Sequence, residues 1–459
     1  MAWRDCQAWC DEGLSLSTTC NQTARLFDAA LNQYVTWTEN PNLDGLQGTL
    51  KSLQNTSPDF AMGMVLSIGL DLMSTGRTPR LDQEFNNSIK QLNQLSQSNS
   101  LSKREKLHCK AVVLFASENL KSACNVWEDI LVDYPNDILA LKFAYDTYFY
   151  LGNSMMIRDS VGRVLPFYKS TNPFYGYLKG MYAFGLQETN LYSLAEKYAK
   201  EALTLNQYDC WASHSLAHCY EMTGQTHTGI DFLSSTEEQW KRGSMLACHN
   251  YWHWALYHVE NGDYDSALDI YDQQISSRTK SSFPLDIVDA VSLLKRLEIQ
   301  GVYVGERWED IYEICQFRLN DHVTVFNDAH YLMSCLGAKK EQSVNLFLRS
   351  VNDYIEISNG DNKDINVQVG LSLYKSIVAF TDERYDDVVE LLYPIKYDLV
   401  KIGGSNAQRE VFQQLLLEAS IKSKAHFKLA KALLHERKLV KENSPLTDRM
   451  MSRLLICHE

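Results

Sequence analysis

Apolar and polar positions repeat in a fixed order between residues 118 and 271 of this 459-residue chain. Each unit has a small or polar turn residue, an aromatic or apolar residue two positions on, a residue that is usually small five on, and one that is usually large nine on. Gly262, Tyr264, Ala267 and Tyr271 show the whole pattern. The turn residues that begin the units are Glu118, Gly152, Asn190, Gly224 and Gly262.

The spacing of these turn residues indicates the kind of repeat. They lie 34, 38, 34 and 38 positions apart, and a period of about 34 residues with this pattern is typical of tetratricopeptide repeats. The small residue lets one helix of a hairpin approach the other, and a hairpin cannot bury its apolar face without stacked neighbours. We therefore predict an all-α fold, a tetratricopeptide-repeat α-solenoid in which helical hairpins form a right-handed superhelix.

The pattern is clearest in the middle of the chain and weaker toward both ends. We expect one continuous repeat array over residues 1–459, with the best-formed repeats in 102–275. Degenerate repeats and C-terminal capping helices are expected in 276–459, where Glu383 begins one recognisable unit. The connections between units are short and polar, and they mark no separate domain.

Composition narrows the class of protein. The formal net charge is −13 and no strongly basic block occurs, which argues against nucleic-acid binding. No apolar run reaches the roughly 18 residues that a membrane helix needs, so we expect no membrane insertion. The first residues lack the apolar core of a signal peptide, and the 11 cysteines include no CxxC pair. These features favour a cytoplasmic protein with reduced thiols.

Half of the 12 histidines lie in residues 209–271. His214 and His218 are four positions apart, and so are His249 and His253, each pair in the expected first helix of a unit. Side chains four apart share one helix face, and the first helices of these repeats line the concave face of the array. The groove residues that we expect to bind a ligand are Trp211, His214, His218, Glu221, His249, His253, Asp146 and His330.

The two histidine pairs admit three interpretations. Two imidazoles on one helix face can bind one metal ion, so His214, His218, His249 and His253 are candidate ligands for zinc or iron. Glu221, about one turn after His218, could be a further ligand or could orient an imidazole. An open coordination position would then permit metal-assisted hydrolysis or oxidation. The same residues could instead line a pocket for a polar peptide or a small molecule, or serve only as scaffold.

Candidate functional residues and motifs elsewhere in the chain are less distinctive. No HExxH, phosphate-binding glycine loop or Gly-x-Ser-x-Gly elbow occurs, so no known catalytic motif supports an enzyme. Asp286 and Asp289 are expected on a solvated helix face or near a helix N-terminus. Gly403 and Gly404 precede a helix and form either an anion-binding nest or a tight turn capped by Ser405.

Six sequence blocks carry a resemblance to a known family. They are AWRDCQAW from Ala2, ALKFAYDTYFYLG from Ala140, DCWASHSLAHCYEM from Asp209, MLACHNYWHWALY from Met245, FNDAHYLMS from Phe326 and GGSNAQREVF from Gly403. With these blocks the chain resembles the tetratricopeptide repeat protein 38 family over its whole length. The resemblance implies an all-helical repeat protein in the cytosol, and it assigns no reaction and no catalytic residue.

Two functions follow from these features. The first is binding of a peptide or partner protein in the concave groove, as in tetratricopeptide arrays generally. The second is a metal-dependent enzyme or small-molecule binder that uses a histidine-rich concave pocket. Stoichiometric metal in the purified protein would favour the second.

Overall fold

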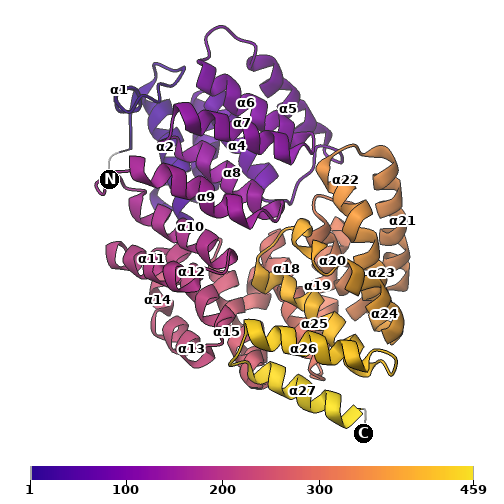
Figure 1. The fold of residues 1–459 in the computed structure, drawn as a ribbon. Helices are drawn as coiled ribbons and strands as arrows, with labels where there is room; N and C mark the ends of the chain where they lie inside the picture. Colours follow the sequence, from indigo (N-terminus) through magenta and orange to yellow (C-terminus); the bar gives the residue numbers. More distant parts are fainter. Residues whose placement is uncertain (1–2, 458–459) are drawn as a thin grey trace. The chain divides into compact units, whose positions relative to one another are not determined.

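The structure is a computed structural model that describes residues 3–457. All its regular elements in this range are helical (Figure 1), in agreement with the predicted all-α class. The chain forms two compact units, one of residues 1–215 and 239–246, the other of residues 216–238 and 247–459. The boundary falls inside helix α12 (Cys210–Met222), whose two ends belong to different units.

Consecutive helices of the first unit pack against one another as hairpins. Helix α6 contacts α7, α7 contacts α8, and α9 contacts α10, which in turn contacts α11. The helices before α12 are α1 (Cys6–Asp11), α2 (Asn21–Thr36), α3 (Gly45–Thr56), α4 (Ala61–Met73), α5 (Gln83–Leu95), α6 (Lys103–Ala116), α7 (Leu120–Asp133), α8 (Ile138–Tyr150), α9 (Ser154–Val164), α10 (Tyr175–Glu188) and α11 (Tyr192–Leu205).

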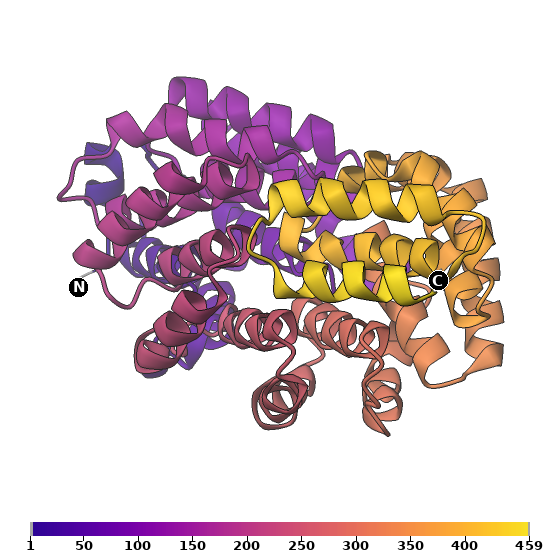
Figure 2. The same ribbon diagram turned by 60° about the horizontal axis from the view of Figure 1, so that its bottom comes forward.

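The second unit continues with helical pairs. Its elements after α12 are α13 (Thr226–Ser235), α15 (Ala247–Asn261), α16 (Tyr264–Ile270), α17 (Ser276–Thr279), α18 (Pro284–Ile299), α19 (Arg307–Cys315), α20 (Val325–Gly337), α21 (Glu341–Ile357), α22 (Asp361–Ile365), α23 (Leu371–Thr381), α24 (Tyr385–Leu392), α25 (Asn406–Lys422), α26 (Phe427–Val440) and α27 (Pro445–Cys457). The short helix α14 (Glu237–Trp240) begins in this unit, which includes its residues up to Glu238. Helices α26 and α27 pack side by side as the last pair (Figure 2).

The predicted turn residues have the backbone conformation that ends one helix and starts the next. Their φ angles are positive, at 60° for Glu118, 63° for Gly152, 62° for Asn190, 71° for Gly224 and 84° for Gly262. A left-handed residue just after a helix lets the chain reverse while the last carbonyl groups stay hydrogen-bonded. The spacing of 34 to 38 residues therefore marks real hairpin turns.

The small residues of the pattern sit where another helix comes close. A Cβ atom added to Gly229, five positions after Gly224, would lie 2.4 Å from the Tyr257 ring of α15. The hydroxyl of that tyrosine donates a hydrogen bond to the Ala217 carbonyl at 2.6 Å. Close packing of this kind fixes one hairpin against the next.

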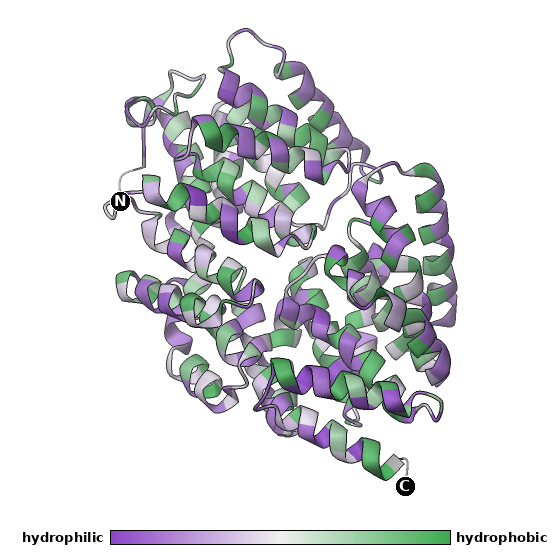
Figure 3. Ribbon diagram, in the orientation of Figure 1, coloured by the Kyte–Doolittle hydropathy of each residue, from purple (hydrophilic) through white to green (hydrophobic). Residues whose placement is uncertain are grey.

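The helices are amphipathic where they border solvent. Apolar and polar residues alternate along helices such as α21 (Figure 3), in which Phe347, Val351 and Tyr354 are buried. Burial of one stripe per helix, rather than of long apolar runs, holds such a fold together. No helix within the described residues combines the length and the apolar character that crossing a membrane requires.

Candidate metal centre

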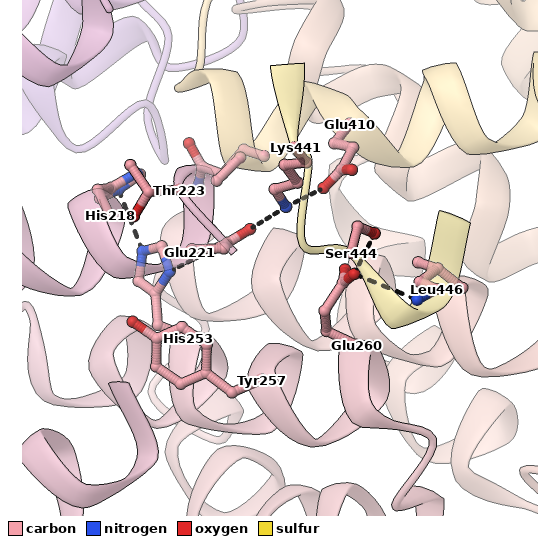
Figure 4. Close-up of polar contacts among 12 residues, drawn as sticks. His218, Glu221, Thr223, His253, Tyr257, Glu260, Glu410, Lys441, Ser444 and Leu446 are labelled. Carbon is pink, nitrogen blue, oxygen red and sulfur yellow. Dashed lines mark hydrogen bonds and ion pairs between the residues drawn. The ribbon is translucent and has the colours of Figure 1, made fainter. Parts of the chain in front are cut away.

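Three histidines of the second unit converge between two neighbouring helices. His218 lies on α12, and His249 and His253 lie one turn apart on α15. Nε2 of His253 is 3.1 Å from Nε2 of His218 (Figure 4). The ring centroids of His249 and His253 are 4.7 Å apart, and the three imidazoles offer nitrogen atoms within 4.8 Å of one another.

Two of these imidazoles contact a carboxylate through Nδ1. Nδ1 of His253 is 2.7 Å from Glu221 Oε2, and Nδ1 of His249 is 2.7 Å from Asp289 Oδ2. A carboxylate at Nδ1 keeps the proton there and makes Nε2 the basic nitrogen. This is the arrangement by which proteins orient metal-binding histidines.

The carboxylates are themselves fixed by further contacts. Asp289 Oδ1 accepts a hydrogen bond from Gln408 Nε2 at 3.3 Å. Glu221 Oε1 lies 3.8 Å from Nζ of Lys441, at the end of α26. Since all four side chains are buried, these contacts restrict the rotation of the carboxylates and, through them, of the imidazole rings.

Burial favours the neutral form of two of these imidazoles, those of His253 and His218. It lowers the pKa of His253 well below 6.5, and nearby His249, Arg296 and Lys441 act in the same direction. The pKa of His218 is lowered in the same way, by burial first and then by His253 and His249. A neutral imidazole is the form that binds a metal, so no proton has to leave these two rings at neutral pH.

His214 precedes His218 by one turn of α12 and is also buried. Its ring stacks on Phe184, with centroids 5.2 Å apart and planes inclined by 24°. The helix thus places both HxxxH histidines on one face, as the four-residue spacing predicted.

The other predicted groove residues have different surroundings. Trp211 is buried and donates a hydrogen bond from Nε1 to the Val35 carbonyl at 3.1 Å. Asp146 forms an ion pair with the buried Lys142 at 2.5 Å. His330 donates from Nδ1 to the Phe326 carbonyl at 2.7 Å, and burial lowers the pKa of its ring to about 3. Ligand binding by these three residues stays a prediction.

The sequence indicated one of the two carboxylates that contact the histidines, since Glu221 follows His218 by about one helical turn, but it did not indicate the other. Asp289 was expected on a solvated face or near a helix N-terminus, and the first of these interpretations was wrong, because its side chain is fully buried against His249. Its position 40 residues after His249 is about one repeat, which is a signal for proximity on adjacent helices. Lys441 follows Glu221 by 220 positions, and no spacing rule connects them.

The glycine pair before α25 forms a capped turn. Gly403 and Gly404 have φ angles of 87° and 78°, and Ser405 caps the helix by accepting a hydrogen bond from the Gln408 amide at 3.1 Å. Arg409 donates a hydrogen bond to the Gly404 carbonyl. Of the two interpretations of this segment, the tight turn is therefore the one that the structure shows.

Comparison with solved structures finds similarity at low sequence identity. No family model matches the chain. It is similar to the human IFIT1 dimer with PPP-AAAA at 14% identity, over 81% of this chain and 90% of that chain, with a TM-score of 0.37. It is also similar to the APC/C hetero-tetramer Cut9-Hcn1 at 11% identity, over 98% of this chain and 89% of that chain, with a TM-score of 0.40.

The hairpins and left-handed turns described above are those of an all-α, tetratricopeptide-like repeat fold. Membership of the tetratricopeptide repeat protein 38 family stays a prediction. The chain is a tetratricopeptide-like helical repeat protein.

Proposed function

We propose that this helical repeat protein binds one zinc ion through His218, His249 and His253. The observation that carries the proposal is the pairing of His249 with Asp289 and of His253 with Glu221, both at Nδ1. A purely structural histidine cluster needs its polar atoms satisfied, but it does not need a separate buried carboxylate at Nδ1 of each of two neighbouring rings.

The spacing of the nitrogens suits a tetrahedral ion. Zinc binds imidazole nitrogen at about 2.0–2.1 Å, which places two ligands of a tetrahedron about 3.3–3.4 Å apart. The 3.1 Å between Nε2 of His218 and Nε2 of His253 is close to this value. The ion would lie between the two Nε2 atoms, and neutral His218 would then have its proton on Nδ1.

The donor set favours zinc over iron. Non-haem iron sites commonly include a carboxylate ligand, whereas Glu221 and Asp289 already contact the outer nitrogens of the imidazoles. With water as the fourth ligand, the site would have the open position of a hydrolytic site.

Partner binding in a groove has less support. Seven of the eight predicted groove residues have buried side chains, and the eighth, Asp146, is engaged by Lys142 and Tyr34. A peptide can contact such residues only after neighbouring side chains move. Binding of a peptide or partner protein elsewhere on the repeats stays a prediction, consistent with the repeat fold.

Elemental analysis of the full-length protein, purified without a histidine tag or chelators, tests the proposal. We expect about one zinc per chain in the wild type and its loss in H253A, because that substitution removes a ligand. The matched control is H227A, which changes an exposed histidine on neighbouring α13 and should keep the zinc. A wild-type protein that holds no stoichiometric zinc, iron or copper, even after loading, would contradict the proposal.

A further inference from the structure

The segment between the last two helices reaches the histidine centre from the far end of the sequence. Lys441 follows the last residue of α26 and is 3% exposed. Its Nζ lies 3.8 Å from Glu221 Oε1 and 3.5 Å from Glu410 Oε2. Figure 4 shows the resulting row of side chains, from His218 through His253, Glu221 and Lys441 to Glu410.

The same segment is fastened to the helix that carries two of the histidines. Glu260, near the end of α15, accepts hydrogen bonds from the Ser444 hydroxyl and, at 3.3 Å, from the Leu446 amide (Figure 4). Arg449 donates to the carbonyls of Glu260 and Val259 at 3.0 and 2.9 Å. A cation at a helix C-terminus is favourable, so Arg449 adds to the docking of residues 441–449 on α15.

We propose that Lys441 is a positioning residue of the metal centre, which holds Glu221 so that Glu221 orients His253. The inference rests on the proposed function. Glu221 uses one oxygen for Nδ1 of His253 and the other for Lys441. A buried carboxylate needs a cation or hydrogen-bond donors to remain charged. Without the ammonium group, the carboxylate would be a weaker and less directed acceptor for His253.

Lys441 does not touch the ion, so its effect must pass through Glu221. Loss of such an outer contact typically lowers metal affinity about 10- to 100-fold. The effect of replacing Lys441 on metal affinity can be separated from a general disturbance of the buried charges. Glu410, the other partner of Lys441, also pairs with Arg437 and so keeps a cation when Lys441 is replaced. Docking of residues 441–449 thereby becomes a condition for tight metal binding.

The test uses the full-length chain, with zinc affinity measured by chelator competition and the ligand field measured by the visible absorption of the cobalt(II)-loaded protein. We expect K441M to weaken zinc binding 10- to 100-fold and to alter the cobalt spectrum. K441R should restore both to within a few-fold, because it keeps the positive charge. K431M is the matched control, since Lys431 is an exposed lysine on α26 and lies outside residues 441–449.

Each outcome decides between the two proposals. If the wild type binds neither zinc nor cobalt, the metal centre and the role of Lys441 both fail. If the wild type binds zinc and K441M keeps its affinity and spectrum, only the role of Lys441 fails. Should K441M not fold, E260Q replaces it, because it weakens the docking of the segment and keeps the Lys441 side chain. Unchanged zinc affinity and cobalt spectrum in E260Q would then overturn the inference.

Discussion

Oδ2 of Asp289 lies 2.7 Å from Nδ1 of His249, and the two residues come from helices α18 and α15. Both side chains are buried, so the contact is made away from water and is correspondingly strong. It repeats, one turn further along α15, in the contact of Glu221 with His253. Two carboxylates from different helices thus act on two adjacent histidines in the same manner.

The contact predicts that D289N weakens zinc binding without removing it. Asparagine keeps the size of the side chain and can still accept a hydrogen bond from Nδ1, but it lacks the charge that makes Nε2 of His249 a strong ligand. We expect zinc affinity to fall about 10- to 100-fold, measured by chelator competition.

The control for this prediction is D269N. Asp269 lies on α16 and is exposed, so the substitution changes the net charge by the same amount at a place that does not contact the histidines. An equal loss of affinity in both variants would mean that the effect is one of overall charge, and the specific role of Asp289 would then be rejected.

The histidine pairs were predictable from the sequence, and so was Glu221 as a residue that could orient an imidazole, but the residues that hold the carboxylates in place were not. A spacing of four residues is enough to place His249 and His253 on one helix face, because helix geometry is local. The contacts of Glu221 with Lys441 and of Asp289 with Gln408 join positions 220 and 119 residues apart. Only tertiary packing brings such residues together, so a single sequence contains no local signal for them.

The hairpins of the fold were predictable because each repeat contains a turn residue and a small packing residue at fixed positions in its own sequence. Gly224 and Gly229 illustrate this, since one has a φ of 71° and the other leaves room for the Tyr257 ring. The irregular helical turns could not be predicted in the same way. Short π-helical turns interrupt the chain at Tyr271–Ile275 and Asn366–Gly370, and such turns add a residue to the helix without a distinctive sequence pattern.

The left-handed turn at Glu383 provides a stability test. Its φ is 58°, and the side chain is exposed. A residue with a Cβ atom is disfavoured in this conformation, whereas glycine is not. We therefore expect E383G to raise the free energy of unfolding by about 0.5–1 kcal/mol, measured by urea denaturation.

The companion variant E390G should have the opposite effect. Glu390 is also exposed but lies within α24, where glycine costs about 1 kcal/mol. Destabilisation by E383G as well would show that the turn gains nothing from a residue without a Cβ atom.

A buried ion-pair cluster in the first unit predicts how stability depends on pH. Asp137 Oδ2 lies 2.8 Å from Arg104 and 2.9 Å from Nε2 of His108. Burial alone would raise the pKa of this carboxyl, but His108 and Arg104 outweigh it and hold the pKa well below its usual range. The deprotonated group therefore stabilises the folded state at pH values above the unfolded pKa of about 3.9.

We expect this stabilisation to be lost as the pH falls below about 4, because the unfolded state then binds a proton that the folded state does not. Urea midpoints between pH 3 and pH 7 measure the effect. In D137N the dependence should become shallower, and the midpoint at pH 7 should drop, since removal of one partner of a buried pair costs about 3–5 kcal/mol. A slope identical to that of the wild type would exclude Asp137 as its source.

Lys142 gives the last prediction, because it is buried among aromatic rings. Its Nζ contacts Asp146 at 2.5 Å and lies 4.7 Å from the ring centroids of both Tyr34 and Trp211. K142M should cost about 3–5 kcal/mol, since it leaves the charge of Asp146 without its cation. Adding D146N should recover part of that loss, because the neutral amide can still accept a hydrogen bond from Tyr34.

Tryptophan fluorescence during urea denaturation reports on this cluster, which includes Trp211. The coupling between the two substitutions should be at least about 1 kcal/mol, as expected for residues in contact. The exposed pair of Lys200 and Glu196, which has the same four-residue spacing and a separation of 2.6 Å, is the control. K200M should change stability by less than about 1 kcal/mol, because water already screens this pair. Additive effects at Lys142 and Asp146 would mean that the aromatic rings, rather than the carboxylate, stabilise the buried ammonium group.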